Sequence, residues 1–373
     1  MKVLYIINSL ITGGAETILA RIISNINNGD IKILVVTFLP GPYRLEKSIK
    51  SNGIEVYNLK LLSLFSSFKT LYRLISIIRK YNPDVTHTFL AFSCLIGGLV
   101  AKYFSKSKII WSIYSTNLER KNNKIGTFIA FKLCAFLSSI IPNEVVFDSS
   151  SAFTSHQKIG YNPNNCNVIN NGVNTKIFKP DNEKKHVLRG EFNIHNCFVV
   201  GTIARFHPDK GYDTLIKAIE IINNLEKKIL FLLCGRDLEN EKFLGYIKAR
   251  KIDNVIIVDE NSNVIDALHL IDLYVSSSYT ESFPNILCEA MACGIPCIST
   301  DVGDSAKIVG DIGIVVRPKN VNDIVNAIIS FYNITIKEKR LLDIQVRQRV
   351  IRNFELKFMI DKYIKLYKKG YIR

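Results

Sequence analysis

The sequence predicts an α/β protein of two domains, each built around a doubly wound parallel β-sheet with helices on both faces. Three observations lead to this prediction. The chain has 373 residues, which is too many for one ordinary hydrophobic core. Its composition, 47% hydrophobic and 22% charged, is typical of a globular protein. Short β-branched runs alternate with amphipathic helical stretches in two separate series, which is the order that parallel sheets require.

The first series starts at the N-terminus, where residues 1–8 form too short an apolar run for a signal peptide and predict a buried strand. The apolar run at 89–104 is short for a membrane span and is interpreted as a core helix. The expected strands are Val3–Ile7, Ile31–Phe38, Val56–Leu59, Val85–Thr88, Ile109–Ser112, Glu144–Phe147 and Asn167–Ile169, and the expected helices are Glu16–Asn25, Leu45–Ser51, Phe68–Tyr81 and Phe92–Tyr103.

A polar stretch from Thr175 to Asn196, with a short helix near 187–192, is expected to connect the domains. The second series follows it and ends in a helical, increasingly basic stretch, so the predicted domains are 1–178 and 179–350, followed by a helix at 351–373. The expected strands are Phe198–Ala204, Ile229–Cys234, Val255–Val258, Leu273–Ser276, Cys297–Thr300 and Gly313–Val316, with helices that begin near Gly211, Glu239, Val264 and Pro284.

Basic residues are concentrated in the first half of the chain. Residues 1–175 carry 19 Lys and Arg against 8 Asp and Glu, whereas residues 176–373 carry 30 against 25. This excess indicates an anionic partner: a nucleic acid, an acidic membrane surface or a phosphorylated substrate. The eight cysteines form no CxxC pair, so neither a disulfide framework nor a zinc site is expected, and a reducing cytoplasm fits best.

The segment from Glu281 to Pro296 is the most informative about function. Glu281 and Glu289 stand eight residues apart, and the residues between them predict a loop that leads into a short helix. The N-terminus of a helix presents unpaired N–H groups that suit a phosphate or diphosphate. A carboxylate on each side of a diphosphate site fits a nucleotide-sugar. The alternative is an ordinary helix rim, but Glu289 stands in an apolar context where a lone carboxylate is costly.

Arg205 and Lys210 follow the first strand of the second domain. A guanidinium and an ammonium group at a strand end would stabilise a departing diphosphate. The alternative is that both are solvated loop cations. Open α/β sheets bind their ligands at the carboxyl ends of the strands, so the position of these two residues favours a functional role.

The first domain offers two further candidates. Gly13, Gly14 and Glu16 follow the first strand and open a helix, so they allow an anionic ligand to approach closely or simply form a tight turn with an acid at the helix N-terminus. His87 ends a strand and can contact a substrate or carry a proton, or it can be a buried structural histidine. The residues alone do not separate these alternatives.

Several motifs are missing from the sequence. It has no Asp-x-Asp pair, no histidine cluster with metal-ligand spacing and no P-loop. We therefore expect no cofactor and no metal ion, and a reaction that relies on cations and helix N-termini.

The stretch from Leu59 to Tyr81 is basic and amphipathic. Its apolar residues are expected to pack mostly against the sheet, with snorkelling cations, while its exposed edge contacts an anionic membrane.

These motifs resemble those of the retaining, GT4-type group 1 glycosyltransferases, which have the GT-B fold of two Rossmann-like domains facing each other across a cleft. The resemblance covers nearly the whole chain and is most specific in the Glu-x7-Glu block. It rests on Gly13-Gly14-Ala15-Glu16, Pro83-Asp84-Val-Thr-His87, Asn170-Asn171-Gly172-Val173-Asn174, Ala204–Gly211, Glu281–Pro296 and Asp301-Val-Gly303-Asp304.

The resemblance implies a role for each matching residue. Arg205 and Lys210 would bind the donor diphosphate, Glu289 the ribose and Glu281 the donor sugar, with the acceptor proton passing to a diphosphate oxygen. The backbone amides of Ser282, Phe283, Asn285 and Ile286, with Gly14 of the first domain, would surround the phosphate and sugar. It also implies that the first domain binds the acceptor, that the last helix crosses back to it and that the donor carries uridine.

The chain departs from the family pattern in three places. Phe89 and Phe92 follow His87 where relatives often have a further histidine, and Tyr114 and Ser115 stand where Arg and His are common. The loop at 259–263, expected to hold the base, is also irregular.

The function predicted is a metal-independent, retaining glycosyltransferase that transfers a sugar from a nucleotide-diphosphate donor to a lipid-linked or glycan acceptor for bacterial surface polysaccharide. The expected location is cytoplasmic or peripheral on the inner membrane face, without a nucleic-acid partner. The alternatives are another GT-B enzyme, such as a nucleotide-sugar 2-epimerase, and a non-catalytic nucleotide-sugar-binding subunit.

Overall fold

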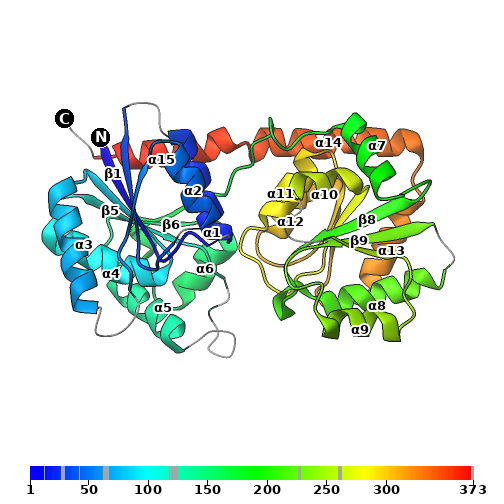
Figure 1. Ribbon diagram of the computed structural model, residues 1–373, viewed down its shortest axis with the longest axis horizontal. Helices are drawn as coiled ribbons and strands as arrows, with labels where there is room; N and C mark the ends of the chain where they lie inside the picture. The colour runs from blue at the N-terminus through cyan, green and yellow to red at the C-terminus, as the bar shows by residue number, and fades with distance from the viewer. Residues whose placement is uncertain are drawn as a thin grey trace. The chain divides into compact units, whose positions relative to one another are not determined.

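The computed structural model describes residues 1–11, 13–26, 30–41, 43–61, 67–116, 118, 125–225, 228–258 and 263–370. These residues form two compact units (Figure 1). Unit 1 consists of Met1–Asn171 and Met359–Arg373, and unit 2 of Gly172–Phe358. The sequence predicts a boundary after residue 178. The structure instead places residues 172–178 in the second unit.

Unit 1 contains a seven-stranded sheet in the order β3-β2-β1-β4-β5-β6-β7, and its neighbouring strands pair in parallel. The strand order reverses between β1 and β4, which makes this the switch point of the sheet. Its strands are β1 (Lys2–Ile7), β2 (Lys32–Thr37), β3 (Glu55–Asn58), β4 (Val85–Phe89), β5 (Lys108–Ile113), β6 (Glu144–Phe147) and β7 (Cys166–Val168).

The helices of unit 1 are divided between the two faces of its sheet. α4 packs against α3 and α5 on one face, whereas α1 packs against α2 (Figure 1). The helices are α1 (Gly14–Ile26), α2 (Arg44–Ser51), α3 (Ser67–Tyr81), α4 (Ala91–Phe104), α5 (Ile125–Leu137), α6 (Ser150–Lys158) and α15 (Leu356–Lys368), the last of which begins in unit 2.

Two consecutive glycines bring α4 close to the sheet. A Cβ at Gly98 would lie 2.5 Å from Nε1 of Trp111, and one at Gly97 would lie 3.0 Å from Cδ1 of Ile6. Larger residues would push the helix away from β1 and β5, so the glycines of this apolar run serve close packing inside a folded domain. Among the described residues, no helix is long and apolar enough to cross a membrane.

The C-terminal helix α15 is held to the rest of unit 1 by polar contacts, some of them buried. The hydroxyl of Tyr367 lies 2.7 Å from Nδ1 of His87 and 3.0 Å from the hydroxyl of Tyr5. The ammonium group of Lys108 donates to the backbone oxygens of Leu366 and Lys369, at 2.7 and 2.8 Å. The structure thus places the end of the chain with unit 1, although residues 351–358 of the expected returning helix belong to unit 2.

Unit 2 contains a six-stranded parallel sheet in the order β10-β9-β8-β11-β12-β13, with its switch point between β8 and β11. Its strands are β8 (Phe198–Ile203), β9 (Ile229–Cys234), β10 (Val255–Val258), β11 (Leu273–Ser276), β12 (Cys297–Thr300) and β13 (Ile314–Val316). Its helices are α7 (Asn182–Glu191), α8 (Tyr212–Asn223), α9 (Glu241–Ala249), α10 (Val264–Leu270), α11 (Asn285–Ala292), α12 (Ser305–Val309), α13 (Val321–Tyr332) and α14 (Ile336–Asn353).

Alternate residues of the unit 2 strands face two separate hydrophobic clusters. On β8, Val199 belongs to the cluster that contains α10, α11 and part of α14, whereas Val200 belongs to the cluster formed with α8, α9 and α13. A sheet covered on both faces buries nearly every residue of its central strands, which is why these strands read as continuous apolar runs.

Candidate functional site

Two of the predicted donor-binding residues of unit 2 meet at the switch point of its sheet. Lys210 lies in the loop after β8, and Glu281 lies in the loop after the neighbouring strand β11. Nζ of Lys210 and Oε1 of Glu281 are 2.5 Å apart, and both side chains are mostly buried, at 23% and 16% exposed. The sequence separates these two residues by 71 positions, and the fold joins them at the strand ends, where open α/β sheets bind ligands.

The loop after β8 needs a glycine to reach this position. Pro208–Lys210 form one turn of 3-10 helix, and Gly211 then adopts a left-handed conformation with φ of 63°. A Cβ at Gly211 would lie 2.0 Å from the backbone oxygen of Ser277, so any larger residue would separate the loop from β11. The hydroxyl of Ser277 donates to the backbone oxygen of Lys210 at 2.8 Å, which fixes the lysine backbone.

The loop after β11 is held by one hydroxyl of its own and by one from the neighbouring strand β12. Ser278 donates to Oε1 of Glu281 at 2.7 Å, and Thr300 at the end of β12 donates to the backbone oxygen of Ser278 at 2.6 Å. Gly303 has φ of 60°, and a Cβ there would lie 2.5 and 2.6 Å from the backbone oxygens of Glu281 and Ser282. The Glu281 carboxylate is therefore positioned from three adjacent loops.

Tyr279 connects the two loops that carry Lys210 and Glu281. Its backbone N–H donates to the backbone oxygen of Asp209 at 2.7 Å. Its hydroxyl donates to Asp213 at 2.6 Å and lies 2.5 Å from the hydroxyl of Thr214, both in the first turn of α8. Sequence reasoning did not identify Tyr279, because the fold alone brings it beside residues of the preceding loop.

Arg205 lies two residues after β8, and its side chain is exposed. The backbone beside it is packed closely, since a Cβ at Gly235, which follows β9, would lie 2.0 Å from the oxygen of Ala204. The structure thus places Arg205 in the same loop as Lys210, with a side chain that is accessible to an anionic ligand.

Helix α11 begins directly after the Glu281 loop. The side chains of Phe283 and Ile286 pack into the hydrophobic core, so only their backbone groups are available to a ligand, while Asn285 is the first residue of the helix. Glu289 is 7% exposed. Its charge adds to the effect of burial, which raises the pKa of the Cys293 thiol to about 12.

In unit 1, the glycine-rich turn follows β1, one of the two strands at the switch point. Gly14 begins α1 and is exposed, and a Cβ there would meet no atom of the chain within 4 Å. The carboxylate of Glu16 lies against Gly13, and burial raises its pKa while a hydrogen bond from its own backbone N–H lowers it. A Cβ at position 13 would meet only the end of the flexible Glu16 side chain, and one at position 14 would meet nothing, so packing within the chain requires a glycine at neither position.

His87 lies inside unit 1 and is fully buried. Its two ring nitrogens lie 2.7 Å from the hydroxyls of Tyr367 and Ser112, and burial lowers its pKa to about 3. A neutral histidine with both nitrogens occupied neither meets a substrate nor exchanges a proton in this conformation. The structure thus favours the structural alternative and does not place His87 in a catalytic position.

The stretch after β5 is partly buried and packs against the rest of unit 1. The ring of Tyr114 stacks on Phe89 with centroids 5.7 Å apart, and its hydroxyl lies 3.2 Å from that of Tyr363. Nε2 of His156 lies 2.9 Å from the backbone oxygen of Ser115, and burial lowers the pKa of His156 to about 4. The irregular loop expected to hold the nucleoside base lies, except for residue 263, outside the described residues.

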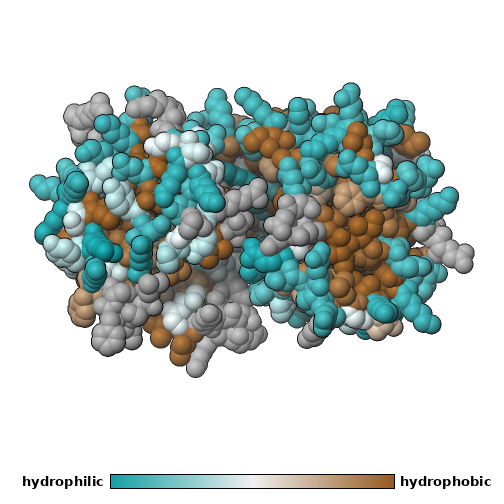
Figure 2. All heavy atoms as spheres, in the orientation of Figure 1, coloured by the Kyte–Doolittle hydropathy of each residue, from teal (hydrophilic) through white to brown (hydrophobic). Residues whose placement is uncertain are grey.

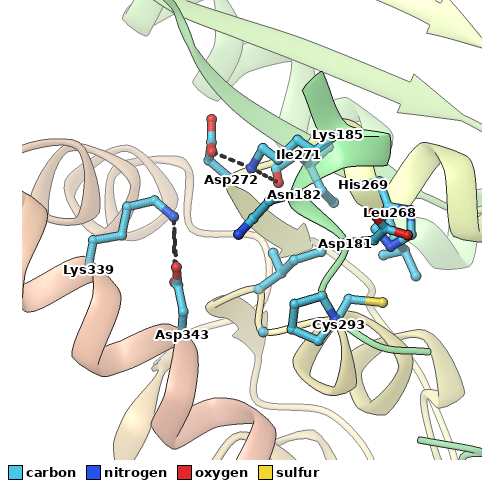
Figure 3. A pocket seen from close by; sticks show the side chains of 13 residues that line it. Asp181, Asn182, Lys185, Leu268, His269, Ile271, Asp272, Cys293, Lys339 and Asp343 are labelled. Carbon is cyan, nitrogen blue, oxygen red and sulfur yellow. Dashed lines mark hydrogen bonds and ion pairs between the residues drawn. The ribbon is translucent and has the colours of Figure 1, made fainter. Parts of the chain in front are cut away.

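A cavity of about 80 Å³ lies elsewhere in unit 2 (Figure 3). Asp272 and Ile295 in its wall precede β11 and β12, so it lies toward the amino ends of the strands, away from Lys210 and Glu281. Four of its charged groups form pairs, Lys185 with Asp272 at 2.8 Å and Lys339 with Asp343 at 3.3 Å, and Asp181 accepts a hydrogen bond from the backbone N–H of Lys184. Among the residues that the structure describes, no cluster of three or more histidine, cysteine or acidic side chains is arranged to hold a metal ion.

Comparison with known proteins agrees with this geometry. Residues 12–177 match the family described as Glycosyltransferase Family 4, and residues 164–345 match Glycosyl transferases group 1. The chain is similar to the capsular polysaccharide biosynthesis glycosyltransferase CapM of Staphylococcus aureus, with 24% identity over 69% of each chain. It is also similar to the UDP-Gal:α-D-GlcNAc-diphosphoundecaprenol α-1,3-galactosyltransferase of Escherichia coli, with 20% identity over 82% of this chain and 80% of that protein.

The structure resembles that of Alr3699/HepE from Anabaena in complex with UDP-glucose, with a TM-score of 0.85 and 18% identity over 99% of this chain and all of that one. At this identity the likeness concerns the fold, which is GT-B. The two family matches overlap at residues 164–177 and together span residues 12–345. The chain therefore belongs to the group 1 glycosyltransferases and is an enzyme that takes its sugar from a nucleotide-sugar donor.

Proposed function

We propose that this enzyme is a retaining, metal-independent glycosyltransferase that transfers a sugar from a UDP-sugar to a lipid-linked or glycan acceptor during the synthesis of a bacterial surface polysaccharide. The observation that carries the proposal is the contact between Lys210 and Glu281 at the switch point of unit 2. This contact brings together a cation for the diphosphate and a carboxylate for the sugar at the carboxyl ends of two neighbouring strands.

Two relatives support the choice of donor and acceptor. The galactosyltransferase from Escherichia coli is named for a UDP-sugar donor and a diphosphoundecaprenol-linked acceptor, and the Anabaena structure contains UDP-glucose. A lipid-linked acceptor would place this enzyme at the inner face of the plasma membrane as a peripheral protein.

The chain's own residues supply the electrostatic part of the reaction. Arg205 and Lys210 would bind the donor diphosphate and stabilise the charge that develops as the bond between the sugar C1 and the diphosphate breaks. Glu281, which holds the Lys210 ammonium group, would accept hydrogen bonds from hydroxyls of the donor sugar. Glu289 would accept hydrogen bonds from the hydroxyls of the ribose. The backbone N–H groups of Ser282 and Phe283, which precede α11, and of Asn285 and Ile286 in its first turn would bind the donor phosphate and sugar.

Retention follows if the acceptor approaches from the side of the leaving group. The acceptor oxygen then forms the new bond to C1 on that face, and its proton passes to an oxygen of the departing diphosphate. This step requires no protein base, which agrees with the burial of His87. The cations of unit 2 would supply the charge that a metal ion supplies elsewhere, and full activity in excess EDTA is the expected result.

The experiment that tests the proposal measures transfer from a panel of UDP-sugars, with and without acceptor. Arg205→Ala and Glu281→Ala should each abolish transfer, whereas the exposed residues Arg352 and Glu239 provide matched controls, Arg352→Ala and Glu239→Ala. The anomeric coupling constant of the product should show the donor's configuration. Full activity in the first two variants, an inverted product or turnover of the donor alone into an epimer would each contradict the proposal.

A further inference from the structure

Helices α3, α4 and α5 cover one face of the unit 1 sheet and carry charge of only one sign. Their 15, 14 and 13 residues contain Lys and Arg but no Asp or Glu. All the cations of these helices are exposed: Lys69, Arg73, Arg79, Lys80, Lys102 and Lys132. A protein surface normally mixes both signs, so these three helices present an unusual excess of positive charge.

The outward face of α5 is apolar. Ile125, Ile129, Leu133 and Phe136 are 62%, 50%, 47% and 74% exposed, and their spacing of three or four residues places them on one side of the helix. The opposite side of α5 is buried in the core through Ala130, Phe131, Cys134 and Ala135. A helix that is hydrophobic all round is normally enclosed on every side, but α5 is enclosed on one side only.

The exposed apolar residues continue onto the neighbouring helices. α3 exposes Phe68 and Tyr72 at 84% and 74%, and α4 exposes Tyr103 at 76%. Figure 2 shows apolar side chains exposed over α5, at the lower edge of unit 1. By contrast, the described residues of α1 and α2 include no exposed large hydrophobic side chain. The apolar residues are thus gathered on the same face as the unbalanced cations.

We propose that this face of unit 1, which we call the α5 surface, docks onto an anionic lipid bilayer, with Ile129, Leu133 and Phe136 inserted among the acyl chains and Lys102 and Lys132 beside the lipid phosphates. A 13-residue helix is too short to span a bilayer but suits the interface. Scattered exposed apolar residues are normal, whereas a group of this size rimmed by charge of one sign marks an interaction surface.

Charge selects the bilayer over a second copy of the chain. In a symmetric dimer the α5 surface would meet itself, and the exposed cations would repel one another because α3, α4 and α5 contain no acid to pair with them. Anionic lipid headgroups offer negative charge along the whole face, and each lysine or arginine near them adds about 1 kcal/mol, or roughly fivefold in binding. The sequence located membrane contact at Leu59–Tyr81, but residues 62–66 of that stretch lie outside the described residues, and α5 carries the larger apolar face.

This inference deepens the membrane location in the proposed function, but vesicle binding needs neither donor nor acceptor, so the two can fail separately. The test is flotation of the full chain with phosphatidylcholine vesicles, with and without phosphatidylglycerol. The wild-type protein should float only with the anionic vesicles, and less at high salt. The double variant Ile129→Ser with Phe136→Ser should bind the anionic vesicles at least about tenfold more weakly, because two inserted side chains are lost.

A matched control comes from unit 2, where Ile336 and Ile344 of α14 are 74% and 60% exposed. Ile336→Ser with Ile344→Ser should leave flotation unchanged, and circular dichroism should show that both double variants are folded. Lys132→Glu should weaken binding to anionic vesicles only. The proposal is overturned if the wild-type chain floats with neither vesicle, if the α5 variant floats as well as the control, or if the α5 variant instead abolishes a concentration-dependent dimer in gel filtration.

Discussion

Nζ of Lys210 lies 2.5 Å from Oε1 of Glu281, and these two residues follow the adjacent strands β8 and β11, between which the strand order of unit 2 reverses. The same carboxylate oxygen also accepts a hydrogen bond from Ser278. The ammonium group is thus held in place before any donor arrives, and catalysis gains when charges are preorganised around the leaving group.

Lys210→Met should lower kcat by about 10² or more, because it removes a cation that stabilises the departing diphosphate. Glu281→Gln should act through the same pair, so the double variant should be little worse than the poorer single variant. Steady-state kinetics of the four proteins tests this expectation. Lys217, which is exposed on α8, provides the control Lys217→Met. Strictly additive losses would show that the two residues act independently.

Tyr279→Phe should raise the donor KM several-fold while kcat changes less. The hydroxyl bonds to Asp213 and Thr214 hold together the loops that carry Lys210 and Glu281, and a looser site binds the donor less well. The control is Tyr246→Phe, on α9. A Tyr279→Phe enzyme whose melting temperature falls while its KM stays unchanged would reduce Tyr279 to a purely structural role.

Gly211→Ala should destabilise unit 2 by about 2 kcal/mol or more, since its left-handed φ of 63° and the 2.0 Å approach to Ser277 both exclude a Cβ. Gly14→Ala is the informative comparison, because a Cβ at Gly14 meets nothing in the chain. It should leave the free energy of unfolding nearly unchanged and lower transfer. If Gly14→Ala were as active as the wild type, the predicted role of Gly14 in donor binding would be wrong.

The stability of unit 1 should fall as the pH drops below about 6.5. Burial lowers the pKa of His87 to about 3 and that of His156 to about 4. Below pH 6.5 these histidines are therefore protonated in the unfolded chain but still neutral in the folded unit, which favours unfolding. Each histidine should contribute a slope of about 1.4 kcal/mol per pH unit between 6.5 and its folded pKa, and none above pH 6.5.

Urea unfolding at pH 7.5, 6.0 and 5.0 measures this slope. His156→Gln should flatten it, whereas His195→Gln, at an exposed position, should not. A stability that does not change over this range would show that the two buried histidines titrate normally.

Most strands could be predicted from the sequence, because a strand buried on both faces is a continuous apolar run with polar loops at its ends. α5 and α6 could not. α5 is apolar nearly all round, so its residues give no helical periodicity, and α6 is short and carries several serines. Hydrophobic periodicity identifies a helix only when the side that faces water carries polar residues.

The site was partly predictable for a related reason. Arg205, Lys210, Glu281 and Glu289 stand out as charged residues after strands or within apolar context, and the structure brings Lys210 and Glu281 together. His87 also follows this pattern, because the sequence does not show whether a polar residue at a strand end faces solvent or a buried hydroxyl. Its partner Tyr367 lies 280 residues away, and no local pattern could have identified it.

The last turns of α15 supply the hydroxyl that pairs with His87 on β4. A ribosome makes β4 long before it makes Tyr367, so during synthesis the nascent sheet holds an imidazole whose partner has yet to emerge. Unit 1 therefore reaches its final form only after unit 2 has been translated, and a nonsense mutation that removes only the last turns of α15 would harm the part of the enzyme encoded first.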